Sequence, residues 1–238
     1  MKNKDLVKYH SKAASSSNGL KLKVCGMKHN TFDVAQLKPD YLGFIFFEKS
    51  KRNYDQAAIE SLPEGIKKVG VFVDASIEFV LDKIKRFQLD VIQLHGSETP
   101  EYCKTLQSGC LIERSRDTAE ATPSKIPEIW KVFSIKDHFD FSVLEAYEAV
   151  VDKFLFDTKG KEKGGNGFTF DWSVLKEYPS QKPFMLSGGI GLEEIAAVNE
   201  LKKTTLPLAG IDVNSKFEDE PGLKNIDLLK SLIKELNR

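Results

Sequence analysis

Short apolar runs alternate with amphipathic stretches along most of this chain. Residues 41–47 read YLGFIFF and residues 68–73 read KVGVFV, and apolar runs of this length are typical of strands covered on both faces. After the second of these runs, Ile77, Val80, Leu81 and Ile84 recur at the spacing of one helix face. Strands that alternate with helices in this way predict an α/β fold with a parallel sheet.

The pattern predicts eight strands, at residues 20–25, 41–47, 68–73, 90–94, 129–135, 154–156, 183–186 and 208–213. It predicts helices at residues 30–37, 56–61, 76–87, 98–107, 142–151, 172–178, 192–201 and 224–237, with Asp171 as an N-cap. About eight such units predict a single (β/α)8 TIM barrel over residues 20–238. A doubly wound open sheet is the alternative, but no GxGxxG follows the first strand, which counts against a dinucleotide-binding fold.

Two stretches fall outside this regular alternation. Residues 1–19 end in a serine-rich segment and are expected to form a flexible N-terminal tail. Residues 108–128 contain Pro123 and Pro127 and are expected to form a long surface excursion, in which residues 111–112 can add a short strand. Cys110 is expected just past the end of the preceding helix.

Charge and cysteine content narrow the possible functions. Lys plus Arg and Asp plus Glu each number 35 in 238 residues, so no basic excess indicates nucleic acid and no polybasic block indicates an anionic membrane. No apolar run can span a bilayer, and the N-terminus lacks the apolar core of a secretory signal. The three cysteines form no CxxC pair, which disfavours a disulfide framework or a metal site and fits the cytoplasm.

Reactive side chains follow the predicted strands at their carboxyl ends. In a parallel barrel all these ends open onto one face, which is where such barrels hold their active sites. The sequence therefore predicts one site there. The side chains at these positions are Cys25, Arg52, Asp74, His95, Asp157, Ser187 and Asn214.

Each candidate also has a structural explanation. Cys25 can be a small buried hydrophobe, or a thiolate base if Lys23 or Arg52 lowers its pKa. His95 can be a catalytic base or can bond an adjacent loop. Arg52 can be a solvated loop charge, or its planar donor fork can bind a substrate carboxylate. Asp157 can cap a turn, with the glycine-rich loop after it serving only as a linker.

A glycine-rich segment after the seventh strand indicates an anion site. Ser187, Gly188 and Gly189 precede a predicted helix, and glycines let a backbone approach an anion closely. Asn214 and Ser215 follow the eighth strand, and barrels commonly bind phosphate after strands seven and eight. A turn that merely closes the strand is the alternative. The position favours phosphate binding.

The order and spacing of eight segments resemble the phosphoribosylanthranilate isomerase family of tryptophan biosynthesis. The segments are KVCGM, GFIFFEKSKR, VGVFVD, IQLHG, FLFDT, GGNGFTFDW, LSGGI and GIDVNS. The resemblance implies a TIM barrel that converts N-(5-phosphoribosyl)anthranilate to 1-(2-carboxyphenylamino)-1-deoxyribulose 5-phosphate. This Amadori rearrangement needs no cofactor and no metal in the family.

Roles for particular residues follow from the same resemblance. It implies that Cys25 is the general base, that Asp157 is the general acid, and that Arg52 faces the anthranilate carboxylate. His95 would also bind the substrate, and a loop containing Gly165 and Gly167 would close over it. The phosphate would lie against Ser187, Gly188, Gly189, Asn214 and Ser215.

One motif position departs from the family, because Lys216 stands where a glycine is usual. Two other functions stay open. A histidine-pathway isomerase would share the phosphate site but would have an aspartate in place of Cys25. A non-catalytic barrel that binds a phosphorylated metabolite would need neither Cys25 nor Asp157. The expected partner is a small phosphorylated substrate, with the chain a monomer or a homodimer.

Overall fold

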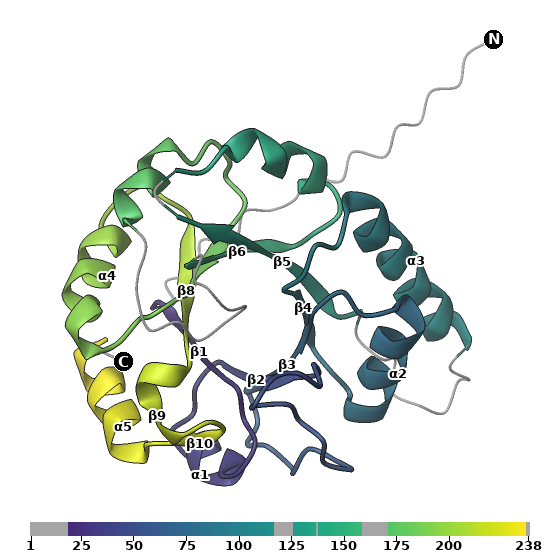
Figure 1. Cartoon of the computed structure of the whole chain (residues 1–238), viewed down its shortest axis with the longest axis horizontal. Helices are drawn as coiled ribbons and strands as arrows, with labels where there is room; N and C mark the ends of the chain where they lie inside the picture. The colour runs from purple at the N-terminus through teal and green to yellow at the C-terminus, as the bar shows by residue number, and fades with distance from the viewer. Residues whose placement is uncertain (1–18, 117–125, 137, 159–170, 237–238) are drawn as a thin grey trace.

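A closed barrel of eight parallel strands forms the centre of the molecule (Figure 1). The computed structural model describes residues 19–116, 126–136, 138–158 and 171–236. Each strand pairs with the next, and β8 pairs with β1 to close the ring, which confirms the predicted (β/α)8 TIM barrel. The strands are β1 (Lys21–Cys25), β2 (Tyr41–Ile45), β3 (Lys67–Phe72), β4 (Val91–Leu94), β5 (Glu128–Ile135), β6 (Lys153–Thr158), β7 (Phe184–Leu186) and β8 (Leu208–Val213).

Helices surround this ring. The α-helices are α1 (Thr31–Ala35), α2 (Ile77–Phe87), α3 (Pro100–Arg116), α4 (Ile195–Lys202) and α5 (Ile226–Glu235). The 3-10 helices are η1 (Phe141–Tyr147), η2 (Trp172–Glu177), η3 (Leu192–Glu194) and η4 (Ser215–Phe217). Two of the predicted helices are thus 3-10 rather than α-helical. The N-cap prediction is confirmed, because the Asp171 carboxylate accepts a hydrogen bond from the Ser173 amide at the start of η2.

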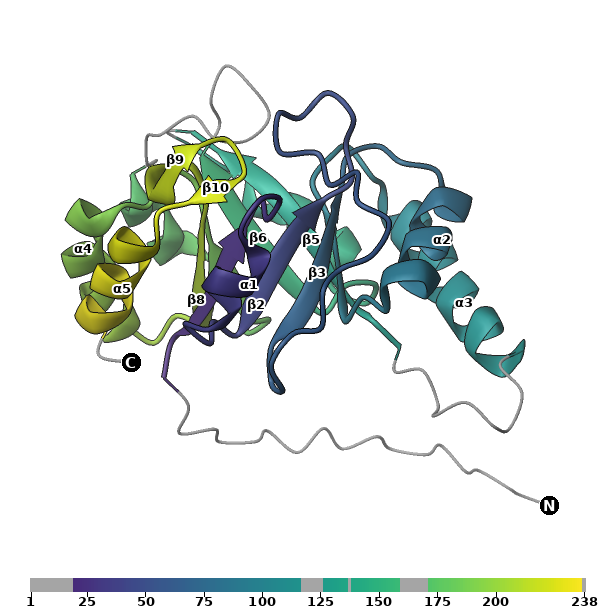
Figure 2. The ribbon, with the colours of Figure 1, turned by 90° about the horizontal axis from the view of Figure 1, so that it is seen from below.

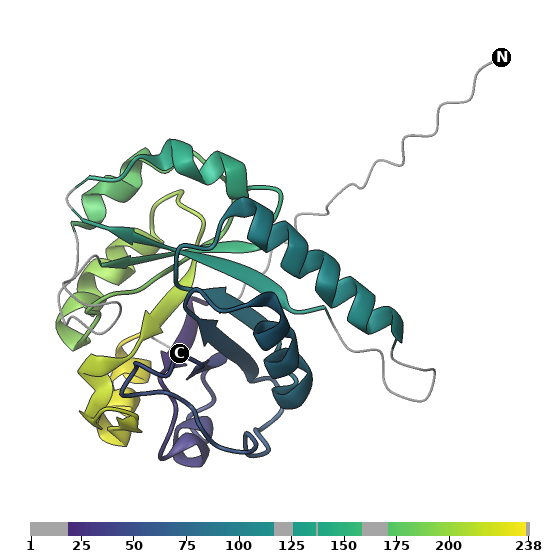
Figure 3. The same ribbon diagram turned by 45° about the vertical axis from the view of Figure 1, so that its right-hand side comes forward.

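The predicted short strand at residues 111–112 is wrong, because both residues belong to α3. Cys103, Leu106 and Cys110 are buried at spacings of three and four, which gives one apolar helix face. Cys110 therefore lies inside the helix and not past its end. Figure 3 shows how far this helix extends along the outside of the barrel. Residues 117–125 of the predicted excursion lie outside the described part of the chain.

The predicted helix at residues 56–61 is also wrong, since this segment is an irregular loop between β2 and β3. A helix of only six residues gains little from its own hydrogen bonds. Here side chains from outside the segment donate hydrogen bonds to its carbonyl groups instead. Tyr54 donates to the Ala58 carbonyl oxygen at 2.7 Å, and Arg86 donates to the Ala57 carbonyl oxygen at 3.0 Å.

A small hairpin precedes the last helix, and the sequence pattern did not predict it. Its strands are β9 (Glu218–Glu220) and β10 (Leu223–Lys224), paired antiparallel. Lys224 therefore belongs to a strand, and the last helix begins at Ile226 rather than at residue 224. Asn225 is the N-cap of α5, since its side chain accepts from the Leu228 amide at 2.9 Å.

The strands bury both faces, and alternate residues point to different layers. Leu22 and Val24 belong to the core between the strands and the helices, whereas Cys25 belongs to a second cluster inside the barrel with Trp130. Because side chains alternate along a strand, Lys23 lies on the same inner face as Cys25. Among the described residues, no helix is long and apolar enough to cross a membrane.

Candidate active site

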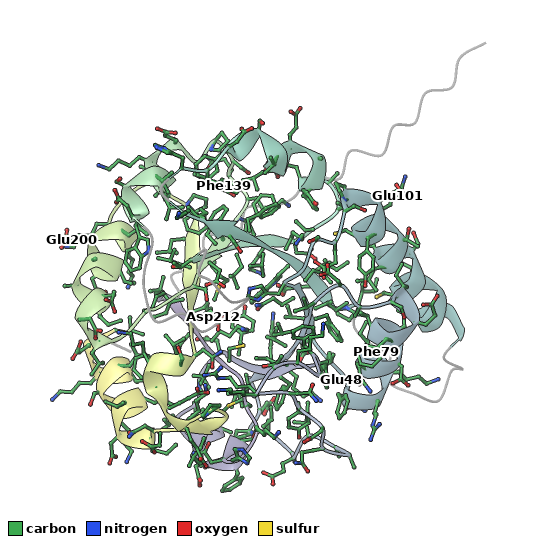
Figure 4. All side chains as sticks on the ribbon, in the orientation of Figure 1. Glu48, Phe79, Glu101, Phe139, Glu200 and Asp212 are labelled. Atoms are coloured by element: carbon green, nitrogen blue, oxygen red, sulfur yellow. The ribbon has the colours of Figure 1, made fainter. Side chains whose placement is uncertain are left out.

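A pocket opens at the carboxyl ends of the barrel strands. It brings together most of the residues that the sequence predicted for the site. Asp212, which the sequence did not single out, also lines the pocket and lies near the middle of the barrel opening (Figure 4). The predicted residues in the pocket wall are Cys25, His95, Asp157, Ser187, Gly188, Gly189, Asn214 and Ser215.

The Cys25 thiol lies above a buried ion pair. Lys23 Nζ is 2.7 Å from Asp212 Oδ2, and the two side chains are 0% and 5% exposed. A methyl group placed on Gly43 would lie 2.9 Å from Cys25 Sγ and 3.1 Å from Lys23 Nζ, so the thiol and the ammonium group are near neighbours. Burial opposes the charge on Lys23, but Asp212 and Cys25 outweigh it and raise the pKa of Lys23.

Two effects act against each other on Cys25. Burial raises the pKa of the Cys25 thiol, because a thiolate is costly in a medium of low polarity. The positive charges of Lys23 and Lys224 lower this pKa, and the negative charge of Asp212 raises it. Burial outweighs the lysines, so the pKa of Cys25 is above its ordinary value. The two lysines limit this rise.

Asp157 lies across the barrel from Cys25, at the end of β6. His95 Nε2 is 3.1 Å from Asp157 Oδ2, and the amide of Thr158 donates to Asp157 Oδ1 at 2.9 Å. The carboxyl group is buried, with its side chain 9% exposed. His95 and the Thr158 amide together fix the orientation of the carboxyl group toward the pocket. A carboxyl group held in this way can donate or accept a proton at one defined position.

The loop after β7 takes a conformation that suits glycine. Gly188 and Gly189 have φ angles of 88° and 68°, a region that other residues rarely adopt. A side chain at Gly188 would also come within 2.7 Å of Asp157 Oδ1. The bare backbone therefore reaches the pocket beside the carboxyl group. Lys216 lines the pocket too, and its Nζ is 2.9 Å from Glu193 Oε1.

Arg52 lies at the rim and is held by a residue that the sequence analysis missed. Its Nη2 is 2.6 Å from Glu218 Oε2, and its Nε donates to the same oxygen at 2.8 Å. Arg52 is not among the residues that line the pocket, although its neighbour Ser50 is. Its predicted contact with a substrate carboxylate stays a prediction.

Two other candidates are placed differently. Asp74 lies outside this pocket, in a separate depression lined with Ser97, Glu98 and Tyr102. Gly165 and Gly167 lie outside the described residues, so their predicted part in binding stays a prediction. Within the described ranges, no three His, Cys, Asp or Glu side chains are grouped so that they could hold a metal ion.

The fold and the pocket define a TIM barrel whose reactive side chains gather at the carboxyl ends of the strands, the catalytic face of such barrels. The family model for N-(5'-phosphoribosyl)anthranilate (PRA) isomerase matches residues 22–235. The PRA isomerase of Parabacteroides distasonis is 42% identical over 222 residues, which cover 90% of this chain and 92% of that protein. The chain therefore belongs to the PRA isomerase family and is an isomerase.

Solved structures of the family agree with the fold. The structure of the Thermotoga maritima isomerase has a TM-score of 0.70 at 28% identity, covering 92% of this chain and 98% of that one. A PRA isomerase solved with reduced 1-(o-carboxyphenylamino)-1-deoxyribulose 5-phosphate has a TM-score of 0.67 at 26% identity, with the same coverage.

Proposed function

We propose that this chain converts N-(5-phosphoribosyl)anthranilate to 1-(2-carboxyphenylamino)-1-deoxyribulose 5-phosphate in tryptophan biosynthesis. One observation carries the proposal. Cys25 and Asp157 face a single pocket from β1 and β6, and the glycine loop after β7 lies in the wall of the same pocket. Membership of the family supports the same reaction, since its relatives carry the name of this isomerase.

In the first step Asp157 acts as the general acid. It gives a proton to the ring oxygen of the ribose, the bond from this oxygen to C1 breaks, and the nitrogen lone pair forms a C1=N iminium bond. The 3.1 Å contact with His95 supports this role, because it holds the carboxyl group at a fixed position. A general acid in this place typically contributes about 10²–10⁴-fold to the rate.

In the second step Cys25 acts as the general base. Its thiolate takes the proton from C2, and the electrons of the C–H bond move to form C1=C2 while the iminium bond returns its pair to nitrogen. The resulting enol then loses its hydroxyl proton and gains one at C1, which leaves the ketone. The Lys23 ammonium group supports the thiolate by its charge.

The two ends of the substrate bind to different residues around the pocket. We place the phosphate at Ser187, Gly188 and Gly189, together with Asn214 and Ser215, which all line the pocket. Closely approached backbone amides are suited to an anion. The anthranilate carboxylate would then lie toward Arg52, and the loop with Gly165 and Gly167 would cover the substrate.

Two further properties are part of the proposal. One solved structure is of monomers generated from the dimeric isomerase of Thermotoga maritima, and this chain is proposed to act as a monomer or a homodimer. The three cysteines are unpaired, which supports the cytoplasm as the place of action. A histidine-pathway isomerase remains the nearest alternative, and the cysteine at position 25 counts against it.

A fluorescence assay tests the function. Phosphoribosylanthranilate is generated in solution and its emission is followed after addition of wild-type chain or of the Asp157→Asn, Cys25→Ala or Cys110→Ala variant. Wild type and Cys110→Ala, which changes a buried cysteine of α3 outside the pocket, should remove the emission rapidly. Asp157→Asn and Cys25→Ala should slow the loss of emission by about 10²–10⁴-fold. Full activity in both would refute the assigned roles.

A binding measurement separates the non-catalytic alternative. A barrel that only binds a phosphorylated metabolite would take up the reduced product analogue and leave the fluorescence of the substrate unchanged. The proposed isomerase should bind the analogue in wild type and in Cys25→Ala with comparable affinity, because that substitution removes a proton acceptor and leaves the phosphate contacts in place.

A further inference from the structure

Two buried, charged side chains of the β9–β10 hairpin lie between the residues proposed for the two ends of the substrate. Glu218 and Lys224 are 3% and 0% exposed, and their carboxylate and ammonium groups are 2.6 Å apart. Charged groups are rarely buried in this way unless they have fixed partners. The partners here are Arg52 on one side and Asn214 on the other.

Glu218 accepts hydrogen bonds from one edge of the Arg52 guanidinium group. Glu218 Oε2 accepts from Arg52 Nε at 2.8 Å and from Nη2 at 2.6 Å, and Oε1 accepts from Nε at 3.0 Å. Contacts of this kind fix the plane of the group as well as its position. Among the described residues, no hydrogen bond involves Arg52 Nη1. Of the groups that the structure describes, none takes up this edge, and it can donate to a second carboxylate.

Lys224 makes the connection to the phosphate side. Its Nζ donates to Asn214 Oδ1 at 2.8 Å while it contacts Glu218. The position of Gly26 shows how close Arg52 and Asn214 lie to each other. A methyl group placed there would lie 2.8 Å from Arg52 Cδ and 2.7 Å from Asn214 Oδ1. Arg52 and Asn214 are thus neighbours over Gly26, joined through the hairpin.

The hairpin itself is fixed to the loop after β1. The Asn30 amide group donates to the Lys224 carbonyl oxygen at 2.8 Å, and the Lys224 amide donates to Asn30 Oδ1 at 3.0 Å. The His29 amide also donates to the Gly222 carbonyl oxygen at 3.0 Å. Figure 2 shows the hairpin at the same rim of the barrel as the loop between β2 and β3 that carries Arg52.

The opposite charges of Glu218, Arg52 and Lys224 stabilise one another. Burial opposes ionisation of Glu218, but its hydrogen bonds with Arg52 and Lys224 outweigh burial and hold the pKa of Glu218 below its ordinary value. Burial lowers the pKa of Lys224, and Glu218 counteracts this. The carboxylate of Glu218 is therefore the anchor of the cluster.

We propose that Glu218 and Lys224 are positioning residues for substrate binding, because Glu218 orients Arg52 toward the substrate carboxylate and Lys224 orients Asn214 toward the phosphate. The inference rests on the proposed function, since Arg52 and Asn214 are the substrate contacts named there. It adds that the hairpin, and not only the strand ends, determines how the two ends of the substrate are spaced.

Inhibition by two small anions tests the proposal. Anthranilate probes the carboxylate end and inorganic phosphate probes the other end, each as a competitor of substrate turnover. Glu218→Gln should raise the KM and the inhibition constant of anthranilate by about 10-fold, because Arg52 loses its fixed orientation, and should change that of phosphate less than about twofold. Lys224→Met should raise the inhibition constant of phosphate by about 10-fold and change that of anthranilate less than about twofold. In Glu218→Gln, kcat should change less than KM.

Glu128→Gln is the matched control. Glu128 also accepts from two lysines, Lys67 and Lys153, but it lies at the start of β5, at the other end of the barrel. This variant should leave both inhibition constants within about twofold of wild type. If Glu218→Gln does not fold, Glu218→Asp keeps the charge while shortening its reach, and should weaken anthranilate in the same direction.

Several results would overturn the inference. An unchanged or lower inhibition constant for anthranilate in a folded Glu218→Gln variant would mean that Glu218 is neutral or competes with the ligand. Equal weakening of both anions would indicate a general loss of structure. These outcomes in a chain whose wild type turns over phosphoribosylanthranilate would leave the proposed function intact. A wild type without turnover would refute the proposed function and the inference with it.

Discussion

Replacing Lys23 by methionine tests how strongly its ammonium group lowers the pKa of the Cys25 thiol. The distances from a methyl group on Gly43 mean that Cys25 Sγ and Lys23 Nζ are no further apart than the sum of 2.9 Å and 3.1 Å, about 6 Å. At that separation, with an effective dielectric constant of about 20, the attraction between thiolate and ammonium is roughly 3 kcal/mol. Since about 1.4 kcal/mol is a factor of ten, the thiolate population at neutral pH should fall by about 100-fold.

The pH dependence of kcat is the measurement that distinguishes this cause. Lys23 lowers the pKa of Cys25, so its removal raises that pKa and moves the rising limb of the profile to higher pH. Lys23→Met should therefore be impaired at neutral pH and regain activity as the pH rises. Alkylation of Cys25 by iodoacetamide, followed against pH by mass spectrometry, should shift in the same direction.

The double variant Lys23→Met, Asp212→Asn serves as the control for folding. Removing only Lys23 leaves the carboxylate of Asp212 buried without its partner, which typically costs about 3–5 kcal/mol. The double variant removes that cost, and circular dichroism would show whether it stays folded. A lower kcat with the same pH profile as wild type, in a folded protein, would refute the electrostatic role of Lys23.

Two further predictions concern other parts of the molecule. Burial opposes the charge of Glu128, but Lys153 and Lys67 lower its pKa from the ordinary value of 4.5 to about 2. The ionised carboxylate therefore stabilises the fold fully above pH 4.5, and this stabilisation is lost as the pH falls toward 2. Because the side chains are partly exposed, Glu128→Gln should cost about 1–2 kcal/mol in urea unfolding at pH 7 and roughly half as much or less at pH 3, and an equal cost at both would contradict this. Lys216→Gly should raise KM by about two- to fivefold at low salt and not at high salt, whereas Lys203→Ala, which changes an exposed lysine of another ion pair, should have no effect.

The strand ends of the site could be predicted from the sequence because a parallel barrel brings them together regardless of their separation along the chain. Cys25, His95, Asp157 and Asn214 each follow a short apolar run, and all four line the pocket. The alternation of side chains carried a further signal. A charge two residues before Cys25 had to share its face of the strand, which places Lys23 inside the barrel.

Partners from distant segments could not be predicted in the same way. Glu218 lies in the stretch EDEPGLKN, whose charges are typical of a solvated loop. Its partner Arg52 is 166 residues away, and no local pattern connects the two. The prediction of a helix at residues 56–61 was wrong for a related reason, since contacts from Tyr54 and Arg86 replace the hydrogen bonds of a short helix. Asp212 was detectable, as a lone acid in the buried run LAGIDV.

The place of the Lys23–Asp212 pair connects the closing of the barrel with its chemistry. The two residues are direct partners in the register between β1 and β8, the strands at which the ring closes. A buried ion pair is weak evidence for stability, because apolar residues in its place are often as good or better. Its cost is understandable if the ammonium group also serves Cys25, two residues further along β1. A correct register at this seam is then the condition for a charged base, since a shift of one residue would turn Lys23 out of the barrel.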